Sequence, residues 1–275
     1  MIALATVLSI AKIVEMPYGG SVTLASMLPI LLVSYRRGVR FGLGAALVFA
    51  VIQQLLGLNN LSYVTTWQSV VAVILLDYIV AFAVIGLGGV FRVFEKNIKS
   101  KPGRQAIVLG CGMLFVCVLR YVSHTVAGAT VWAGLSIPTE AALVYSLGYN
   151  ATYMIPETII NLLSAVWVGN ALDLSCEIPL PMKRTRAVGR VGDVIVILRQ
   201  VSLFALLASI AADSVLVFAK LQSPENGEFA LSGIRDVNPI LFLAVLVFGV
   251  AVSSLCFIVS KILEKRADSK TSELC

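Results

Sequence analysis

The sequence has 275 residues, of which 59% are hydrophobic and 13% charged. Soluble domains have about 25% charged residues, so this chain has too little polar surface to cover a globule in water, and a soluble fold is excluded. Its 21 Lys and Arg against 15 Asp and Glu give a net charge of +6, but these residues fall in short clusters between apolar runs. A continuous basic surface for nucleic acid is therefore excluded, and an all-α integral membrane protein in a lipid bilayer is predicted.

Eight apolar runs approach or reach the roughly 20 residues that a membrane-spanning helix needs. In chain order they are residues 1–14, 20–35, 39–57, 67–91, 105–128, 145–172, 194–219 and 238–262. The first is short because Lys12 and Glu15 close it; either this helix is abbreviated or its true start lies upstream. A removable signal peptide is the alternative for this segment, although no basic residues precede its apolar run.

Lys and Arg residues collect after every second apolar run. The clusters lie within 36–40, 92–104, 183–190 and 261–270, whereas the connections 57–66 and 129–144 have neither Lys nor Arg. Short cytoplasmic loops are enriched in these residues. Both termini are therefore predicted to be cytoplasmic in a multi-pass protein of the plasma membrane.

The segment 173–192, DLSCEIPLPMKRTRAVGRVG, is predicted to be a cytoplasmic linker because it has two prolines and four basic residues. It divides a six-helix bundle at 1–172 from an additional pair of transmembrane helices and a cytoplasmic tail at 193–275. The unusual polar residues lie almost entirely in the bundle, so the function is expected there. The terminal pair is expected to be dispensable for ligand binding and to act in assembly or membrane placement.

Motifs for several other chemistries are missing from the sequence. Its five cysteines form no C-x-x-C pair and it has a single histidine, so neither a metal site nor a disulfide framework is predicted. It has no G-x-x-x-x-G-K-[ST] motif for binding ATP, and no H-E-x-x-H or G-x-S-x-G motif. The chain is therefore not expected to be an enzyme.

Ionisable and amide side chains recur in the expected spans, at depths nearer the outside. They are Asp77 in 67–91, Arg120 and His124 in 105–128, and Asn150 and Glu157 in 145–172. Charged groups are costly in a membrane and usually mark an ion pair, a cavity or a ligand site. A polar pocket open to the outside is therefore predicted. A purely structural Arg120–Glu157 ion pair and a helix–helix hydrogen bond of His124 are the alternatives.

Aromatic residues gather toward the same side. They are Tyr63, Trp67, Tyr78, Tyr121, Trp132, Tyr145, Tyr149 and Tyr153. Interfacial aromatic belts occur at both faces of a bilayer, so a one-sided cluster favours a pocket. Aromatic faces beside a carboxylate suit a flat, cationic, hydrogen-bonding ligand.

Four segments of the bundle are distinctive in sequence. They are YGGSVTLASMLPILLVSYRRGVRFGL (18–43), LLDYIVAFAVIGLGGVFR (75–92), RYVSHTVAGATVW (120–132) and YSLGYN (145–150). In this order and spacing, over about residues 1–172, the chain resembles the thiamine-specific substrate-binding subunit, or S-component, of energy-coupling factor (ECF) vitamin transporters. The R-Y-x-x-H-x-x-A-G-x-x-x-W run followed by Y-S-L-x-x-N is the most specific part.

The resemblance implies a six-helix bundle that captures thiamine from outside for ATP-driven uptake. Thiamine would be the transported ligand rather than a cofactor, and the implied partners are a transmembrane coupling subunit and two ABC-type ATPases. The implied ligand contacts are Asp77, Tyr78, His124, Trp132, Tyr145 and Asn150. Tyr63 matches a loop tyrosine of the family, and Trp67 competes with it for that role. Tyr121 and Glu157, from the polar stripes, complete the candidate set.

Two departures from the family are visible. The acid at the Asp77 position is often Glu in the family, and the helices at 194–262 have no counterpart in the six-helix pattern. An autonomous ion-coupled secondary transporter, with Arg120, Glu157 and Asp77 relaying protons, is the alternative function. Such transporters commonly have inverted repeats and broken helices, and neither is evident in the sequence. A membrane-embedded enzyme or structural subunit is the third possibility.

Overall fold

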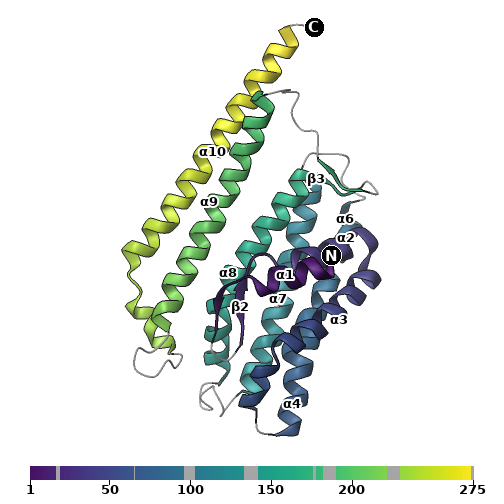
Figure 1. Cartoon of the computed structure of the whole chain (residues 1–275), viewed down its shortest axis with the longest axis vertical. Helices are drawn as coiled ribbons and strands as arrows, with labels where there is room; N and C mark the ends of the chain where they lie inside the picture. The colour runs from purple at the N-terminus through teal and green to yellow at the C-terminus, as the bar shows by residue number, and fades with distance from the viewer. Residues whose placement is uncertain are drawn as a thin grey trace.

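The computed structural model describes residues 1–16, 19–64, 66–95, 103–132, 142–175, 178–181, 190–221 and 230–273. The chain is a set of packed helices with two short hairpins (Figure 1). In the described part, six helical segments are long and apolar enough to cross a membrane. They are Val39–Leu56, Trp67–Glu95, Arg104–Thr130, Ala142–Ala171, Val191–Leu221 and Pro239–Ala267. The prediction of an all-α membrane protein is confirmed.

The predicted spans at 1–14 and 20–35 are wrong. Helix α1 (Ile2–Ile10) has 9 residues, and α2 (Leu28–Arg37) has 10. Between them, strand β1 (Lys12–Glu15) pairs antiparallel with β2 (Ser21–Thr23). A 10-residue helix is about 15 Å long, half the thickness of the hydrocarbon core. Each apolar run is therefore longer than its helix because it joins the helix to a strand of the hairpin.

Glycines at the hairpin explain why the chain leaves the helical path there. Gly19 and Gly20 have φ of 96° and 92°, in the left-handed region that other residues rarely adopt. After the hairpin, Ala25 also has positive φ, at 58°. The sequence therefore turns back within the bundle instead of crossing it.

The segment Trp67–Glu95 changes helix type along its length. It comprises α4 (Trp67–Val73), a π-helix η2 (Ile74–Val80), α5 (Ala81–Ala83), a 3₁₀-helix η3 (Val84–Phe91) and α6 (Arg92–Glu95). π-helical turns are rare and often coincide with functional sites. Here the π-helix contains Asp77 and Tyr78.

Small residues allow η3 to approach α2 and α3 (Val39–Leu56) closely. The Ser34 hydroxyl of α2 donates to the carbonyl oxygen of Gly86 and accepts the N–H of Gly89 at 2.9 Å. A Cβ added to Gly86 would lie 2.5 Å from the backbone nitrogen of Leu43. Side chains at these glycines would therefore force three helices apart.

We expect Gly86→Ala to lower the apparent melting temperature of the detergent-solubilised protein, because the added methyl meets backbone that cannot rotate away. Overpacking of this kind costs about 1–3 kcal/mol. Gly44→Ala, in α3, is the matched control, since an added Cβ there meets nothing within 4 Å. Thermal unfolding of the two variants tests this, and equal melting temperatures would contradict the close helix crossing.

The remaining elements complete the bundle and the terminal pair. They are η1 (Leu58–Tyr63), α7 (Arg104–Thr130), α8 (Ala142–Ala171), β3 (Leu172–Asp173) paired with β4 (Leu180–Pro181), α9 (Arg190–Leu221), η5 (Leu231–Asp236) and α10 (Pro239–Glu273). Helix α9 lies between α10 and α8 (Figure 1). In the predicted linker 173–192, residues 176–177 and 182–189 are outside the described residues.

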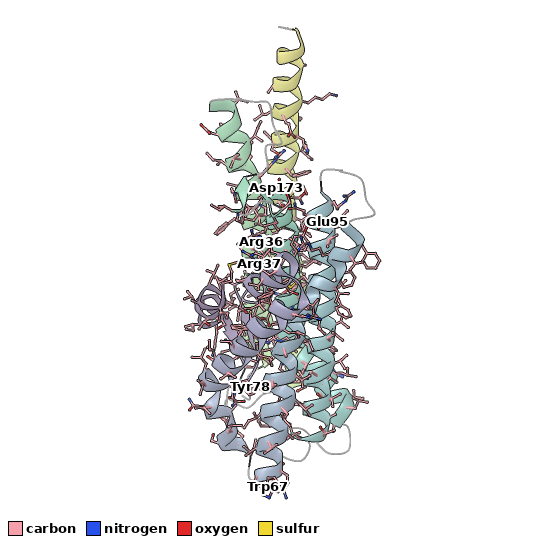
Figure 2. All side chains as sticks on the ribbon, turned by 90° about the vertical axis from the view of Figure 1, so that its right-hand side faces the viewer. Arg36, Arg37, Trp67, Tyr78, Glu95 and Asp173 are labelled. Carbon is pink, nitrogen blue, oxygen red and sulfur yellow. The ribbon has the colours of Figure 1, made fainter. Side chains whose placement is uncertain are left out.

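Labelled residues distinguish the two ends of the bundle. Trp67 lies at one end, and Glu95 and Asp173 lie toward the other (Figure 2). Near Glu95, the Arg92 guanidinium donates to the carbonyl oxygens of Tyr35 and Arg36 at 3.1 and 2.7 Å. We call the two ends of the bundle the Trp67 end and the Glu95 end. The Lys and Arg residues at 96–101 and 183–186, on which part of the predicted orientation depends, lie outside the described residues.

Candidate functional site

A cavity of about 480 Å³ lies between the β1–β2 hairpin, α3, the π-helix, α7 and α8. This volume falls within the range of ordinary small-molecule sites. Its lining combines aromatic rings, amides and charged groups contributed by segments far apart in sequence. The cavity is therefore a property of the folded bundle rather than of any single motif.

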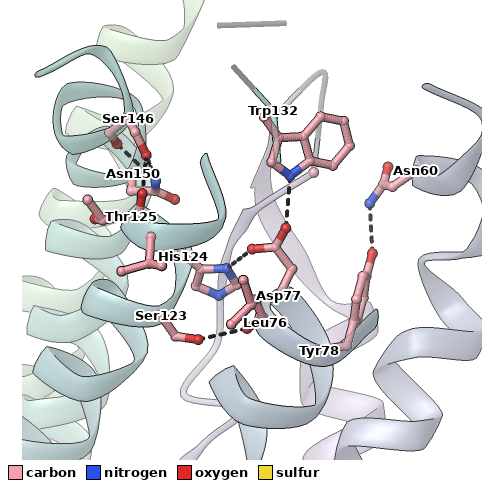
Figure 3. A network of polar contacts seen from close by, with 12 residues as sticks. Asn60, Leu76, Asp77, Tyr78, Ser123, His124, Thr125, Trp132, Ser146 and Asn150 are labelled. Atoms are coloured by element: carbon pink, nitrogen blue, oxygen red, sulfur yellow. Dashed lines mark hydrogen bonds and ion pairs between the residues drawn. The ribbon is translucent and has the colours of Figure 1, made fainter. Parts of the chain in front are cut away.

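Asp77 is the centre of a three-residue hydrogen-bond network (Figure 3). One carboxylate oxygen lies 2.9 Å from Nδ1 of His124, and the other accepts the indole N–H of Trp132 at 2.9 Å. The carboxylate therefore favours the tautomer of His124 with its proton on Nδ1. That tautomer leaves Nε2 as an acceptor, and Nε2 has no partner among the described residues.

The Tyr78 hydroxyl binds other parts of the protein. It donates to the carbonyl oxygen of Gly57 at 3.2 Å and accepts from the amide of Asn60 at 3.0 Å. A Cβ at Gly57 would collide with this hydroxyl, so glycine leaves room for the Tyr78 contact. Tyr78 thus holds the η1 connection in place, and its ring contributes to the cavity wall.

Helix α8 forms the opposite wall. The Tyr153 hydroxyl donates to Oδ1 of Asn150 at 2.7 Å, and the Asn150 amide donates to the carbonyl oxygen of Ser146 at 2.9 Å. These side chains are buried, and each bond fixes the next. Asn150 therefore has a set orientation before any ligand enters.

The hairpin packs against this tyrosine wall. The Tyr149 hydroxyl donates to the carbonyl oxygen of Gly19 at 2.9 Å. A Cβ at Gly20 would lie 2.7 Å from the Tyr153 ring. Glycine at position 20 is therefore needed twice, for the positive φ and for the close approach of the ring.

A buried ion pair extends inward from the cavity. Nη1 of Arg120 lies 3.3 Å from Oε1 of Glu157, which also accepts the Thr23 hydroxyl at 3.1 Å. The Arg120 guanidinium lies 4.4 Å from the centre of the Phe82 ring. Arg120 lines the cavity, whereas Glu157 is only 2% exposed and does not. The Arg120–Glu157 ion pair is therefore present, and of its two members only Arg120 reaches the cavity.

The pairing of charges decides what the cavity attracts. Lys12 pairs with Glu15 at 2.5 Å, and Arg120 pairs with Glu157. Among the described lining residues, Asp77 is therefore the carboxylate that has no Lys or Arg partner. Asp77 therefore brings a carboxylate without a Lys or Arg counter-charge to the cavity wall, which suits a cationic ligand.

The cavity includes six of the ten predicted site residues. Asp77, Tyr78, His124, Trp132, Tyr145 and Asn150 line it. The other four lie outside the lining: Trp67 is 73% exposed and Tyr63 is 47% exposed, Glu157 is buried in its ion pair, and the Tyr121 hydroxyl donates to the carbonyl oxygen of Leu147. Depth along a helix was readable from the sequence, but the direction of each side chain was not.

Sequence reasoning missed the hairpin as part of the site. Lys12, Glu15 and the two glycines line the cavity, although the hydropathy pattern placed them at the ends of membrane spans. The Gly19–Gly20 pair, which follows Lys12 and Glu15 and a proline at position 17, was the available signal for a turn. Tyr149, expected only in the aromatic cluster, also lines the cavity.

Comparison with known proteins gives two matches. Residues 1–173 match the family model described as "Thiamine transporter protein (Thia_YuaJ)". The chain is 39% identical over 164 residues to the thiamine transporter ThiT of Bacillus subtilis (strain 168), an alignment that covers 58% of this chain and 81% of that protein. The family match ends before α9 begins, and every residue that lines the cavity lies within it.

Proposed function

Because the chain belongs to the thiamine transporter protein family, we propose that it is the substrate-binding subunit of an ECF-type transporter, which captures thiamine for uptake by an ATP-driven partner module. The family supports a transporter rather than an enzyme. The observation that carries the proposal is the Asp77 carboxylate, which has no Lys or Arg partner, inside the aromatic cavity.

The site offers complementary groups for both parts of thiamine. The thiazolium ring is a flat cation, which a carboxylate and aromatic faces can stabilise. The amino group of the aminopyrimidine ring is an N–H donor, which suits two acceptors of the cavity, the free Nε2 of His124 and Oδ1 of Asn150. Asp77 acts in two ways, through its charge and by setting the tautomer of His124.

A separate energy source is part of the proposal. The sequence has no G-x-x-x-x-G-K-[ST] motif, so ATP binding of the P-loop kind requires other chains. We propose that the Trp67 end faces the outside of the plasma membrane and the Glu95 end faces the cytoplasm. Four arginines, Arg36, Arg37, Arg92 and Arg104, lie toward the Glu95 end, and basic residues are enriched on the cytoplasmic side. The coupling subunit and two ATPases would act from that side.

We expect the chain alone to bind thiamine but not to concentrate it. In lipid vesicles with an imposed proton or sodium gradient, thiamine should not accumulate above its external concentration. The reason is that, in this proposal, the energy for uptake comes from ATP hydrolysis by a partner module and not from an ion gradient. The control is thiamine binding by the same preparation in detergent. Concentrative uptake driven by either gradient would establish the secondary-transporter alternative and contradict the proposal.

A further inference from the structure

Helix α9 has one face committed to α10. The hydroxyls of Ser202 and Ser253 lie 2.9 Å apart, and Nη2 of Arg199 lies 2.8 Å from a carboxylate oxygen of Glu264. A Cβ at Gly249 of α10 would lie 2.3 Å from the Ser209 hydroxyl. Hydrogen bonds, an ion pair and a close approach therefore hold the two helices together as one unit.

A second face of α9 packs against the bundle. Leu207, Ile210 and Val217 pack on the buried core that includes the cavity tyrosines, and Leu221 belongs to that core. In chain order these four residues are separated by three, seven and four positions, so they lie on one side of the helix. Helix α9 contacts both α8 and strand β1, and β1 belongs to the hairpin that lines the cavity. This packing argues against a terminal pair that is independent of the ligand site.

Helix η5 adds a third contact. The backbone N–H of Ala230, the residue before η5, donates to the carbonyl oxygen of Leu221 at 2.8 Å, so η5 begins at the end of α9. Leu231, the first residue of η5, then meets α8 at Gly148: a Cβ added there would lie 3.1 Å from Cδ1 of Leu231. Because Gly148 has no side chain, the Leu231 side chain can pack directly against the backbone of α8 at this position.

Gly148 lies in the turn of α8 that holds the hairpin. Its neighbour Tyr149 lines the cavity and donates to the carbonyl oxygen of Gly19. A shift of this turn would move the Tyr149 hydroxyl away from the hairpin. The contacts thus run in sequence from Leu231 through Gly148 and Tyr149 to Gly19.

We propose that α9 and η5 brace the cavity wall, and that Leu231 acts as a positioning residue which slows ligand release by fixing the Tyr149 turn of α8. The inference rests on the proposed binding of thiamine. Helices α9 and η5, which follow the region that matches the family, thereby gain a role in ligand retention in addition to any role in assembly. Leu231 itself does not line the cavity.

The test is the dissociation rate of radiolabelled thiamine from the purified full-length chain after excess unlabelled thiamine is added. Leu231→Ala should release thiamine about threefold to tenfold faster, an effect typical of truncating a partly buried contact. Leu231→Met should restore the slow rate because it refills most of the space. Phe248→Ala is the matched control, since this α10 side chain is 73% exposed, and it should release thiamine at the wild-type rate.

A double-variant cycle keeps the proposal testable if Leu231→Ala folds poorly. Gly148→Ala alone should speed release, because its methyl crowds Leu231. Combined with Leu231→Ala, it should speed release less than the product of the two single effects, because the methyl refills part of the gap. Wild-type rates in Leu231→Ala and Gly148→Ala, with saturable binding in the wild type, would overturn the brace while the proposed function stands. Absence of binding by the wild type would instead refute the proposed function.

Discussion

Replacing Asp77 by Asn should weaken thiamine binding by about tenfold to a hundredfold, which corresponds to the loss of a charged hydrogen bond of order 1.5–3 kcal/mol. The carboxylate accepts from both His124 and Trp132. An amide has one acceptor oxygen, so one of these donors loses its partner and the tautomer of His124 is no longer fixed. The cation of the ligand also loses its counter-charge. Calorimetric titration of the purified full-length chain measures the change.

Asp173→Asn is the matched control for this prediction. It makes the same chemical change toward the Glu95 end of the bundle, away from the cavity (Figure 2). We expect it to bind thiamine as the wild type does. Near-wild-type affinity of Asp77→Asn, with a normal melting temperature, would remove Asp77 from the ligand site.

Replacing Arg120 by Met should destabilise the protein more than Gly86→Ala or Asp77→Asn does. The variant leaves Glu157 almost completely buried without its cation and held only by Thr23 among its described contacts. Breaking a buried ion pair by removing one partner costs about 3–5 kcal/mol. Thermal unfolding in detergent measures the effect, and by the usual scaling the melting temperature should fall by roughly 6–20 °C.

The paired variant Arg120→Met, Glu157→Leu separates charge burial from loss of packing. Because both charges are removed, most of the stability should return, as is common when apolar residues replace a buried ion pair. Equal destabilisation by the single and the paired variant would show that packing around Arg120, rather than the unpaired Glu157 charge, dominates.

The sequence predicted the membrane fold well wherever an apolar run was unbroken. The runs beginning near residues 39, 105 and 194 each became a single long helix, because nothing within them opposes helical geometry. The run at 20–35 failed, because a hydropathy pattern does not distinguish a short strand and an irregular turn from helix. Ala25, at φ of 58°, has no sequence signal at all.

The candidate site shows the same division. His124 and Asp77 were predicted from their ionisable side chains in a membrane span, and Nδ1 of His124 lies 2.9 Å from a carboxylate oxygen of Asp77. The partner of the Tyr78 hydroxyl could not be predicted, because its contact with Gly57 depends on how η1 folds back. The helix-type change that presents Asp77 also leaves no clear mark in an apolar sequence, since π-helix and α-helix share the same composition.

The most direct test of thiamine binding in this cavity is a titration of the purified full-length chain with thiamine, followed by calorimetry and by intrinsic tryptophan fluorescence. Trp132 lines the cavity, and neither of the other two tryptophans does. We predict saturable heat at one thiamine per chain, together with fluorescence quenching that is lost in Trp132→Phe. No saturable heat and no fluorescence change in the folded wild type would contradict the assignment of this cavity to thiamine.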